Sequence, residues 1–129
     1  MTQRAIYPAG LSAGDVPMKL SPAILSHGHL FLTGMTGSLP GGAMPDDPQA
    51  QFRFAFDKIS NVLSAAGASF ADVIEMTTYH VDLHQHFDTF EAVHATYVTA
   101  PYPAWTAVEV SALRRPGALV EIRVIAQAP

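Results

Sequence analysis

The sequence predicts an α+β domain in which two helices pack on one face of a single β-sheet. Three observations predict this fold: two amphipathic helical stretches, several short segments of alternating polarity, and the order β-β-α-β-α-β-β. The chain contains no internal repeat, linker or low-complexity segment. Residues 1–129 are therefore expected to form one domain.

The first helix is predicted from about Pro48 to Ala66. Asp47 is a suitable N-cap, Pro48 fits the first helical position, and Gly67 follows the last turn. The helix carries one apolar stripe, formed by Phe52, Phe56, Ile59, Leu63 and Ala66. This stripe is expected to cover the sheet.

The second helix is predicted from about Leu83 to Val98, with Asp82 as its N-cap. Its stripe is formed by Leu83, Phe87, Phe90, His94 and Tyr97. One histidine thus lies among apolar side chains, where a histidine is usually a core residue.

Strands are predicted at the segments HLFLTGM, VIEMTTYHV, WTAVEV and LVEIRVIA. In the last segment the even-numbered residues 120–126 are all apolar and are expected to lie beneath the helices. The odd-numbered face carries Glu121 and Arg123 between large apolar residues. This face is available for assembly, and against another subunit Glu121 would become a semi-buried carboxylate.

The composition restricts the class of protein. Apolar residues make up 49% of the chain, charged residues 14%, and the net charge is −4. These values fit a compact globular protein, and nucleic-acid binding receives little electrostatic support. The absence of cysteine excludes disulfides, thiolate catalysis and cysteine metal sites. No signal core or membrane span is recognised, so the protein is expected to be soluble and cytoplasmic, with no membrane partner.

Four segments in this order resemble the RidA/YjgF family of enamine/imine deaminases, whose members are also labelled endoribonuclease L-PSP or translation initiation inhibitor. The segments are LFLTGMTG, QFRFAFDKISNVLSAAGASFADVIEMTTYHVDL, FEAVHATY and YPAWTAVEVSALRRPGALVEIRVIA. The resemblance covers about Met18 to Ala126. It implies a chorismate-mutase-like fold, a homotrimeric barrel with clefts between subunits, and hydrolysis of labile enamines and imines without a metal or organic cofactor.

The site residues of the family match only in part. Its glutamate and its glycine correspond to Glu121 and Gly34. Its carboxylate-binding arginine corresponds to Trp105, its tyrosine to about Leu20, and its asparagine to His94. Backbone groups near Gly34 and Ala107 are expected to orient the reacting carbonyl, imine or water.

Glu121 is the candidate catalytic residue, because a carboxyl group in a partly desolvated cleft can hold and deliver the proton that imine hydrolysis requires. The alternative is an interface ion pair with an arginine. Glu109, on the strand face of Trp105, is a second carboxylate that is either near the cleft or, more ordinarily, solvated or salt-bridged.

Trp105 either lines the cleft or packs at the trimer interface. Tryptophan offers one indole donor and an apolar face, so it cannot neutralise a carboxylate as a guanidinium does. A cleft lined by Trp105 would favour an apolar, aromatic or cationic substrate. Arg114, Arg115 and Arg123 could supply the missing charge, and Arg123 is the first choice because it shares a strand face with Glu121.

Two further patterns are expected to carry no chemistry. His27 with His29, and His84 with His86 near His80, lack the i, i+4 spacing and a clear third ligand of a metal site. The glycine-rich segment TGSLPGGAMPDD lacks the lysine of a phosphate-binding loop and is expected to be an exposed loop.

Three functions remain in view. The first is a RidA-type hydrolase of unusual specificity. The second is a non-catalytic trimer that binds a small metabolite, which the replacement of the family arginine and tyrosine favours. The third is a ribonuclease or translation inhibitor, which the acidic composition disfavours.

Overall fold

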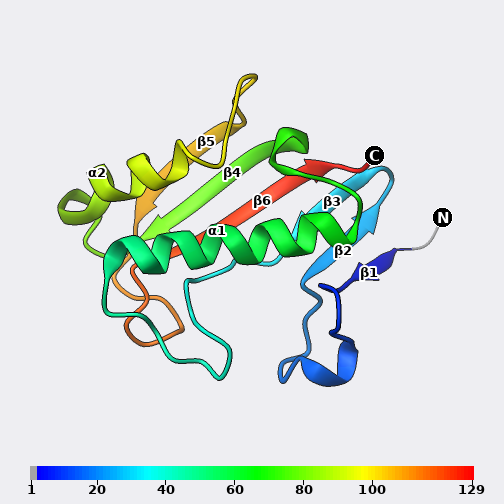
Figure 1. Cartoon of the computed structure of the whole chain (residues 1–129), viewed down its shortest axis with the longest axis horizontal. Helices are drawn as coiled ribbons and strands as arrows, with labels where there is room; N and C mark the ends of the chain where they lie inside the picture. Colours follow the sequence, from blue (N-terminus) through cyan, green and yellow to red (C-terminus); the bar gives the residue numbers. More distant parts are fainter. Residues whose placement is uncertain (1–2) are drawn as a thin grey trace.

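A computed structural model describes residues 3–129 and contains one six-stranded sheet with two α-helices. The strands are β1 (Arg4–Ile6), β2 (Ala23–Ser26), β3 (His29–Leu32), β4 (Val73–His80), β5 (Ala104–Glu109) and β6 (Val120–Gln127). The α-helices are α1 (Pro48–Ala65) and α2 (Leu83–His94), and short 3-10 turns cover Ala13–Asp15 and Phe70–Asp72. The mixed α+β class predicted from the sequence is confirmed, with both helices on one face of the sheet (Figure 1).

The strand order is β1-β2-β3-β6-β4-β5, and every pairing is antiparallel except that of β4 with β5. The parallel pair is joined through α2, as a parallel connection requires. Three strands precede α1 where two were expected. The additional strand, β1, is three residues long and gives no periodic signal of its own, because it is held by pairing with β2.

Helix α1 begins and ends as its sequence predicts. The Asp47 side chain accepts a hydrogen bond from Ala50 N at 3.0 Å, Pro48 opens the helix, and Gly67 follows it with φ +76°. Its apolar stripe is fully buried at Phe52, Phe56, Ile59 and Leu63.

Helix α2 is shorter than predicted. After His94 the chain tightens into turns, in which Thr96 N bonds to Val93 O at 2.9 Å and Tyr97 N to His94 O at 3.0 Å. Asp82 occupies the N-cap position with φ +55°, but its side chain makes no capping hydrogen bond. The Glu109 carboxylate accepts one from Leu83 N at 3.0 Å instead.

The core lies between the helices and the sheet. Val120, Ile122, Val124 and Ala126 of β6 are at most 1% exposed, so this strand buries the predicted face. Its other face, with Glu121, Arg123 and Ile125, is only half-buried. Within residues 3–129, no helix is both long enough and apolar enough to cross a lipid bilayer.

Gln51 holds together the loops at one end of the sheet. Its buried amide donates to Pro45 O and to Gly117 O, and accepts from Leu119 N, each at 3.0 Å. One side chain of α1 thus fixes the loop before α1 and the loop before β6. These two loops form part of the cavity described next.

Candidate functional site

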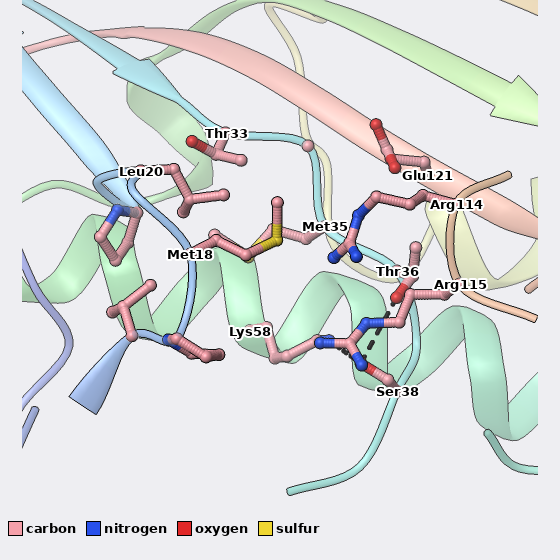
Figure 2. A pocket seen from close by; sticks show the side chains of 14 residues that line it. Met18, Leu20, Thr33, Met35, Thr36, Ser38, Lys58, Arg114, Arg115 and Glu121 are labelled. Carbon is pink, nitrogen blue, oxygen red and sulfur yellow. Dashed lines mark hydrogen bonds between the residues drawn. The ribbon is translucent and has the colours of Figure 1, made fainter. Parts of the chain in front are cut away.

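The structure contains a cavity of about 420 Å³ where three loops meet helix α1 (Figure 2). Its walls come from residues 16–22, residues 33–38, the arginine pair of the β5–β6 loop, Lys58 of α1 and Glu121 of β6. Three of the predicted site residues line it: Leu20, Gly34 and Glu121.

Gly34 and Glu121 are in close contact because the segment after β3 pairs with β6. Met35 N bonds to Ile122 O at 2.8 Å, and Ile122 N to Met35 O at 2.9 Å. A Cβ atom at Gly34 would lie 2.8 Å from Glu121 Cδ, well inside van der Waals contact. Any other residue at position 34 would displace the Glu121 carboxylate from its present position.

Leu20 forms an apolar wall of the cavity, where the family's tyrosine was expected to correspond. Its loop is fixed to the end of β3 by Thr33, whose N bonds to Pro22 O at 2.9 Å and whose Oγ1 donates to Ser21 O at 2.7 Å. Leu20 therefore contributes shape to the cavity and no hydrogen bond.

The cavity also carries the cationic side chains Lys58, Arg114 and Arg115 (Figure 2). The first choice from the sequence, Arg123, does not line it. Arg123 lies farther along β6 on the open face of the sheet, opposite Thr77 of β4. The loop before β6, in contrast, lies against the loop before α1 and brings Arg114 and Arg115 to the cavity.

Lys58 was not singled out from the sequence. Its Nζ donates to Ser38 Oγ at 3.0 Å, and burial together with the charge of Arg115 lowers the pKa of Lys58 to about 8. No sequence signal could have identified it, because its burial and its charged neighbour both depend on distant loops.

The expectation that residues 36–47 form an exposed loop is wrong for the first three. Thr36, Gly37 and Ser38 are buried, because Gly37 packs directly on the backbone of Gln51, where a Cβ would clash. Ser38 consequently points its hydroxyl at Lys58.

Trp105, on β5, faces helix α2 and does not line the cavity. Its ring stacks on His94 at a centroid distance of 4.1 Å and on Phe87 at 5.7 Å. Its indole Nε1 donates to Thr78 Oγ1 at 3.0 Å, so its one polar atom already has a partner. Trp105 remains half-buried, with part of its surface open to solvent.

His94 and Ala107 accompany Trp105. His94 is 8% exposed, its Nε2 has no hydrogen-bond partner among residues 3–129, and burial lowers its pKa. Ala107 lies two residues after Trp105 on the same face of β5 and pairs with Thr78 of β4. In one chain, therefore, the predicted site residues form two groups: Leu20, Gly34 and Glu121 at the cavity, and His94, Trp105 and Ala107 beside α2.

The histidines are dispersed over the structure. His27 lies in the β2–β3 turn with φ +50°, and the buried His80 Nε2 is 2.7 Å from Thr78 Oγ1. Burial lowers the pKa of His80 to about 4. Residues 3–129 contain no group of three or more His, Asp or Glu side chains that could hold a metal ion.

Comparison with known proteins agrees with this architecture. The model of the family described as Endoribonuclease L-PSP matches residues 12–128. The chain is 40% identical over 126 residues to the RutC family protein YjgH of Escherichia coli (strain K12), covering 97% of this chain and 95% of that protein. It is 30% identical to the 2-iminobutanoate/2-iminopropanoate deaminase of Bos taurus, covering 90% and 87% of the two chains. A solved structure of protein YJGH superposes with a TM-score of 0.88 at 38% identity, covering 98% of this chain and 97% of that one.

Proposed function

Because the chain belongs to the endoribonuclease L-PSP family, also called the RidA/YjgF family, we propose that it hydrolyses a small imine or enamine to a carbonyl compound and ammonia. The observation that carries this proposal is the Glu121 carboxylate, held against Gly34 at the wall of a cavity large enough for a metabolite. Deaminase-named relatives at about 30% identity support the same chemistry.

The proposed reaction consumes one water molecule and transfers no electrons. Glu121 in its acid form donates a proton to the imine nitrogen, and water adds to the imine carbon. The resulting carboxylate takes a proton from the added water and returns it to nitrogen. The C–N bond then breaks and ammonia leaves, while the hydroxyl group gives its proton to the Glu121 carboxylate, so that the carbonyl forms and the acid form of Glu121 is restored. An enamine would first be protonated on carbon to give the imine.

The second group of predicted residues, His94, Trp105 and Ala107, does not line the cavity of its own chain and would reach a cavity only in an assembly of several chains. We propose a homotrimer in which Trp105, His94 and Ala107 of one chain approach the cavity of its neighbour. The open face of the sheet supports assembly, since Phe31 and Val108 are 39% and 37% exposed and Phe31 lies opposite Ile125. Trp105 would then present its solvent-open surface to the substrate in place of a guanidinium, which alters specificity.

The test is release of ammonia and keto acid from freshly generated 2-imino acids. Glu121→Gln keeps the size of the side chain but removes the acid, so turnover should fall by about 100-fold or more. Gly34→Ala keeps the acid but displaces it, and a loss of roughly 100-fold is expected. Glu91→Gln, on the exposed surface of α2, is the matched control and should be unchanged.

A variant at Trp105 tests the specificity of the site. Trp105→Arg restores the family's guanidinium and should raise turnover of small imino acids above that of the wild type. Turnover that persists unchanged in Glu121→Gln would contradict the proposed mechanism. Ligand binding without any turnover in the wild type would favour the non-catalytic binding protein.

A further inference from the structure

One end of the cavity gathers positive charge that no carboxylate of residues 3–129 neutralises. Its lining contains Lys58, Arg114 and Arg115 but one carboxylate, Glu121, although the whole chain has a net charge of −4. Burial and Arg115 lower the pKa of Lys58, and among the described residues no carboxylate offsets that effect. Like charges brought together in a half-buried cavity are unfavourable unless an anion joins them.

The hydrogen bonds around Ser38 point to the same end of the cavity. Ser38 is 8% exposed, and its Oγ accepts from Lys58 Nζ at 3.0 Å and from Thr36 Oγ1 at 3.4 Å. In the hydrogen bonds of the described residues, this oxygen serves only as an acceptor. Its own hydrogen is therefore left to donate to a ligand.

Arg115 lies where its own loop meets the loop before α1. Ala118 N bonds to Arg115 O at 3.1 Å, and a Cβ at Gly42 would lie 3.0 Å from Arg115 Nη1. In Figure 2 the side chains of Lys58, Arg115 and Ser38 converge, and Glu121 lies at the opposite side of the cavity. The end with the three converging side chains is distinct from the end that holds the proposed acid.

We propose that Lys58, Arg115 and Ser38 form an oxyanion-binding subsite, which takes a phosphate or carboxylate group of the ligand. An ammonium, a guanidinium and a hydroxyl together offer charge-assisted donors from three directions, and both oxyanions can accept them. Arg114 adds positive charge between this subsite and Glu121. The subsite stands independently of hydrolysis, but if the cavity is catalytic, then its substrate carries an acid group, which binds at the side of the cavity away from Glu121.

The subsite is tested by binding of inorganic phosphate and, separately, of acetate to the full chain, by calorimetry at constant ionic strength. Lys58→Met and Arg115→Met should each weaken binding by about 10-fold or more, because each removes a charged donor. Arg53→Met, an exposed residue of the same helix outside the cavity, is the matched control and should bind normally. The anion that binds with the higher affinity, phosphate or acetate, identifies whether the ligand carries a phosphate or a carboxylate group.

The pH dependence separates a specific role of Lys58 from general charge attraction. Wild-type affinity should fall as the pH rises above about 8, where Lys58 of the free protein loses its proton. Lys58→Arg keeps its charge in this range, so its affinity should stay level between about pH 7.5 and 9.5. Glu121→Gln should bind the anions at least as well as the wild type, which distinguishes failure of the subsite from failure of the proposed hydrolysis.

The proposal is overturned if neither anion shows saturable binding, or if Lys58→Met binds as tightly as the wild type. It is supported if binding is lost in both cavity variants, retained in Arg53→Met, and made independent of pH by Lys58→Arg.

Discussion

The cavity and the aromatic cluster around Trp105 are two ends of one sheet that are built in opposite ways. The cavity is enclosed by loops, its polar contacts are made by side chains such as Gln51 and Ser38, and its charge is positive. The aromatic cluster is formed by regular elements, β5 and α2, and consists of stacked rings around a neutral core. The first end is suited to a ligand, whereas the second stabilises the fold of its own chain and, in the proposed trimer, offers the open surface of Trp105 to a neighbour.

The buried polar groups show the same difference. At the aromatic end, Thr78 Oγ1 accepts from Trp105 Nε1 and lies 2.7 Å from His80 Nε2, so these three polar atoms have partners and only the neutral His94 Nε2 has none among the described residues. At the cavity, Lys58 and Arg115 lie beside each other, and the part of the chain that the structure describes places no carboxylate there to neutralise them. Unmatched charge is a cost to folding and a property that a binding site can use.

The largest effect on stability is expected at the aromatic end. Trp105→Ala removes a ring that stacks on His94 and Phe87, so the free energy of unfolding should fall by about 3 kcal/mol. Chemical denaturation measures this change, with Tyr102→Ala as the control, since Tyr102 is 71% exposed. Phosphate binding to the folded variant should be unaffected. If it weakened as well, the two ends would be coupled and the contrast drawn between them would not hold.

An intermediate effect on the free energy of unfolding is expected for a substitution of Gln51, whose side chain joins two loops of the cavity. Gln51→Leu fills the same volume but leaves Leu119 N and two carbonyl oxygens without partners, so unfolding should become easier by about 2 kcal/mol. Phosphate binding should weaken too, because both cavity loops lose their tether. Gln49→Leu, an exposed residue of the same helix, should change neither property.

The smallest effect on the free energy of unfolding is expected for a substitution of Lys58, and this substitution stabilises the protein, whereas the previous two destabilise it. The pKa of Lys58 is lowered from 10.5 to about 8, so between these values the folded chain binds fewer protons than the unfolded chain. Wild-type stability should therefore rise with pH across this interval, and the penalty is fully present below pH 8. Lys58→Met removes the penalty and should stabilise the protein at pH 7 by about 1 kcal/mol, after allowance for partial exposure.

The measurement is the difference in unfolding free energy between Lys58→Met and the wild type at several pH values. This difference should shrink as the pH rises from 8 towards 10.5. Lys19→Met serves as the control, because Lys19 is exposed. A destabilised Lys58→Met at every pH would show that the contact with Ser38 outweighs the burial of charge.

The aromatic end was largely predictable from the sequence, and the cavity was not. Helical spacing placed Phe87, Phe90 and His94 on one stripe, and strand alternation placed Trp105 and Ala107 on one face, because both periods are local properties. The cavity depends on loops that are distant in sequence. Its glutamate and glycine came from the family resemblance. Arg114 and Arg115 were candidates from the sequence but ranked below Arg123, and Lys58 and Ser38 became recognisable only once those loops were folded together.

Glu109 illustrates how a residue can be noticed for the wrong reason. Its place on the strand face of Trp105 suggested a second cleft carboxylate, with a solvated or ion-paired side chain as the alternative. In the fold it accepts a hydrogen bond from Leu83 N at 3.0 Å, and so it supplies the cap that Asp82 does not. A cap provided from 26 positions away cannot be inferred from helix-start patterns, which are local.

The stacking of Trp105 on His94 also makes the molecule its own optical reporter. The chain contains one tryptophan, so all indole emission comes from the contact between β5 and α2. An imidazolium ring quenches a stacked indole more strongly than a neutral imidazole does. Because burial lowers the pKa of His94, the emission should stay bright at neutral pH and dim only in more acidic solution. Fluorescence of this protein would thus report the protonation of His94 at the packed end of each chain, and in the proposed trimer it would also report a ligand that reaches Trp105 from the cavity of the neighbouring chain.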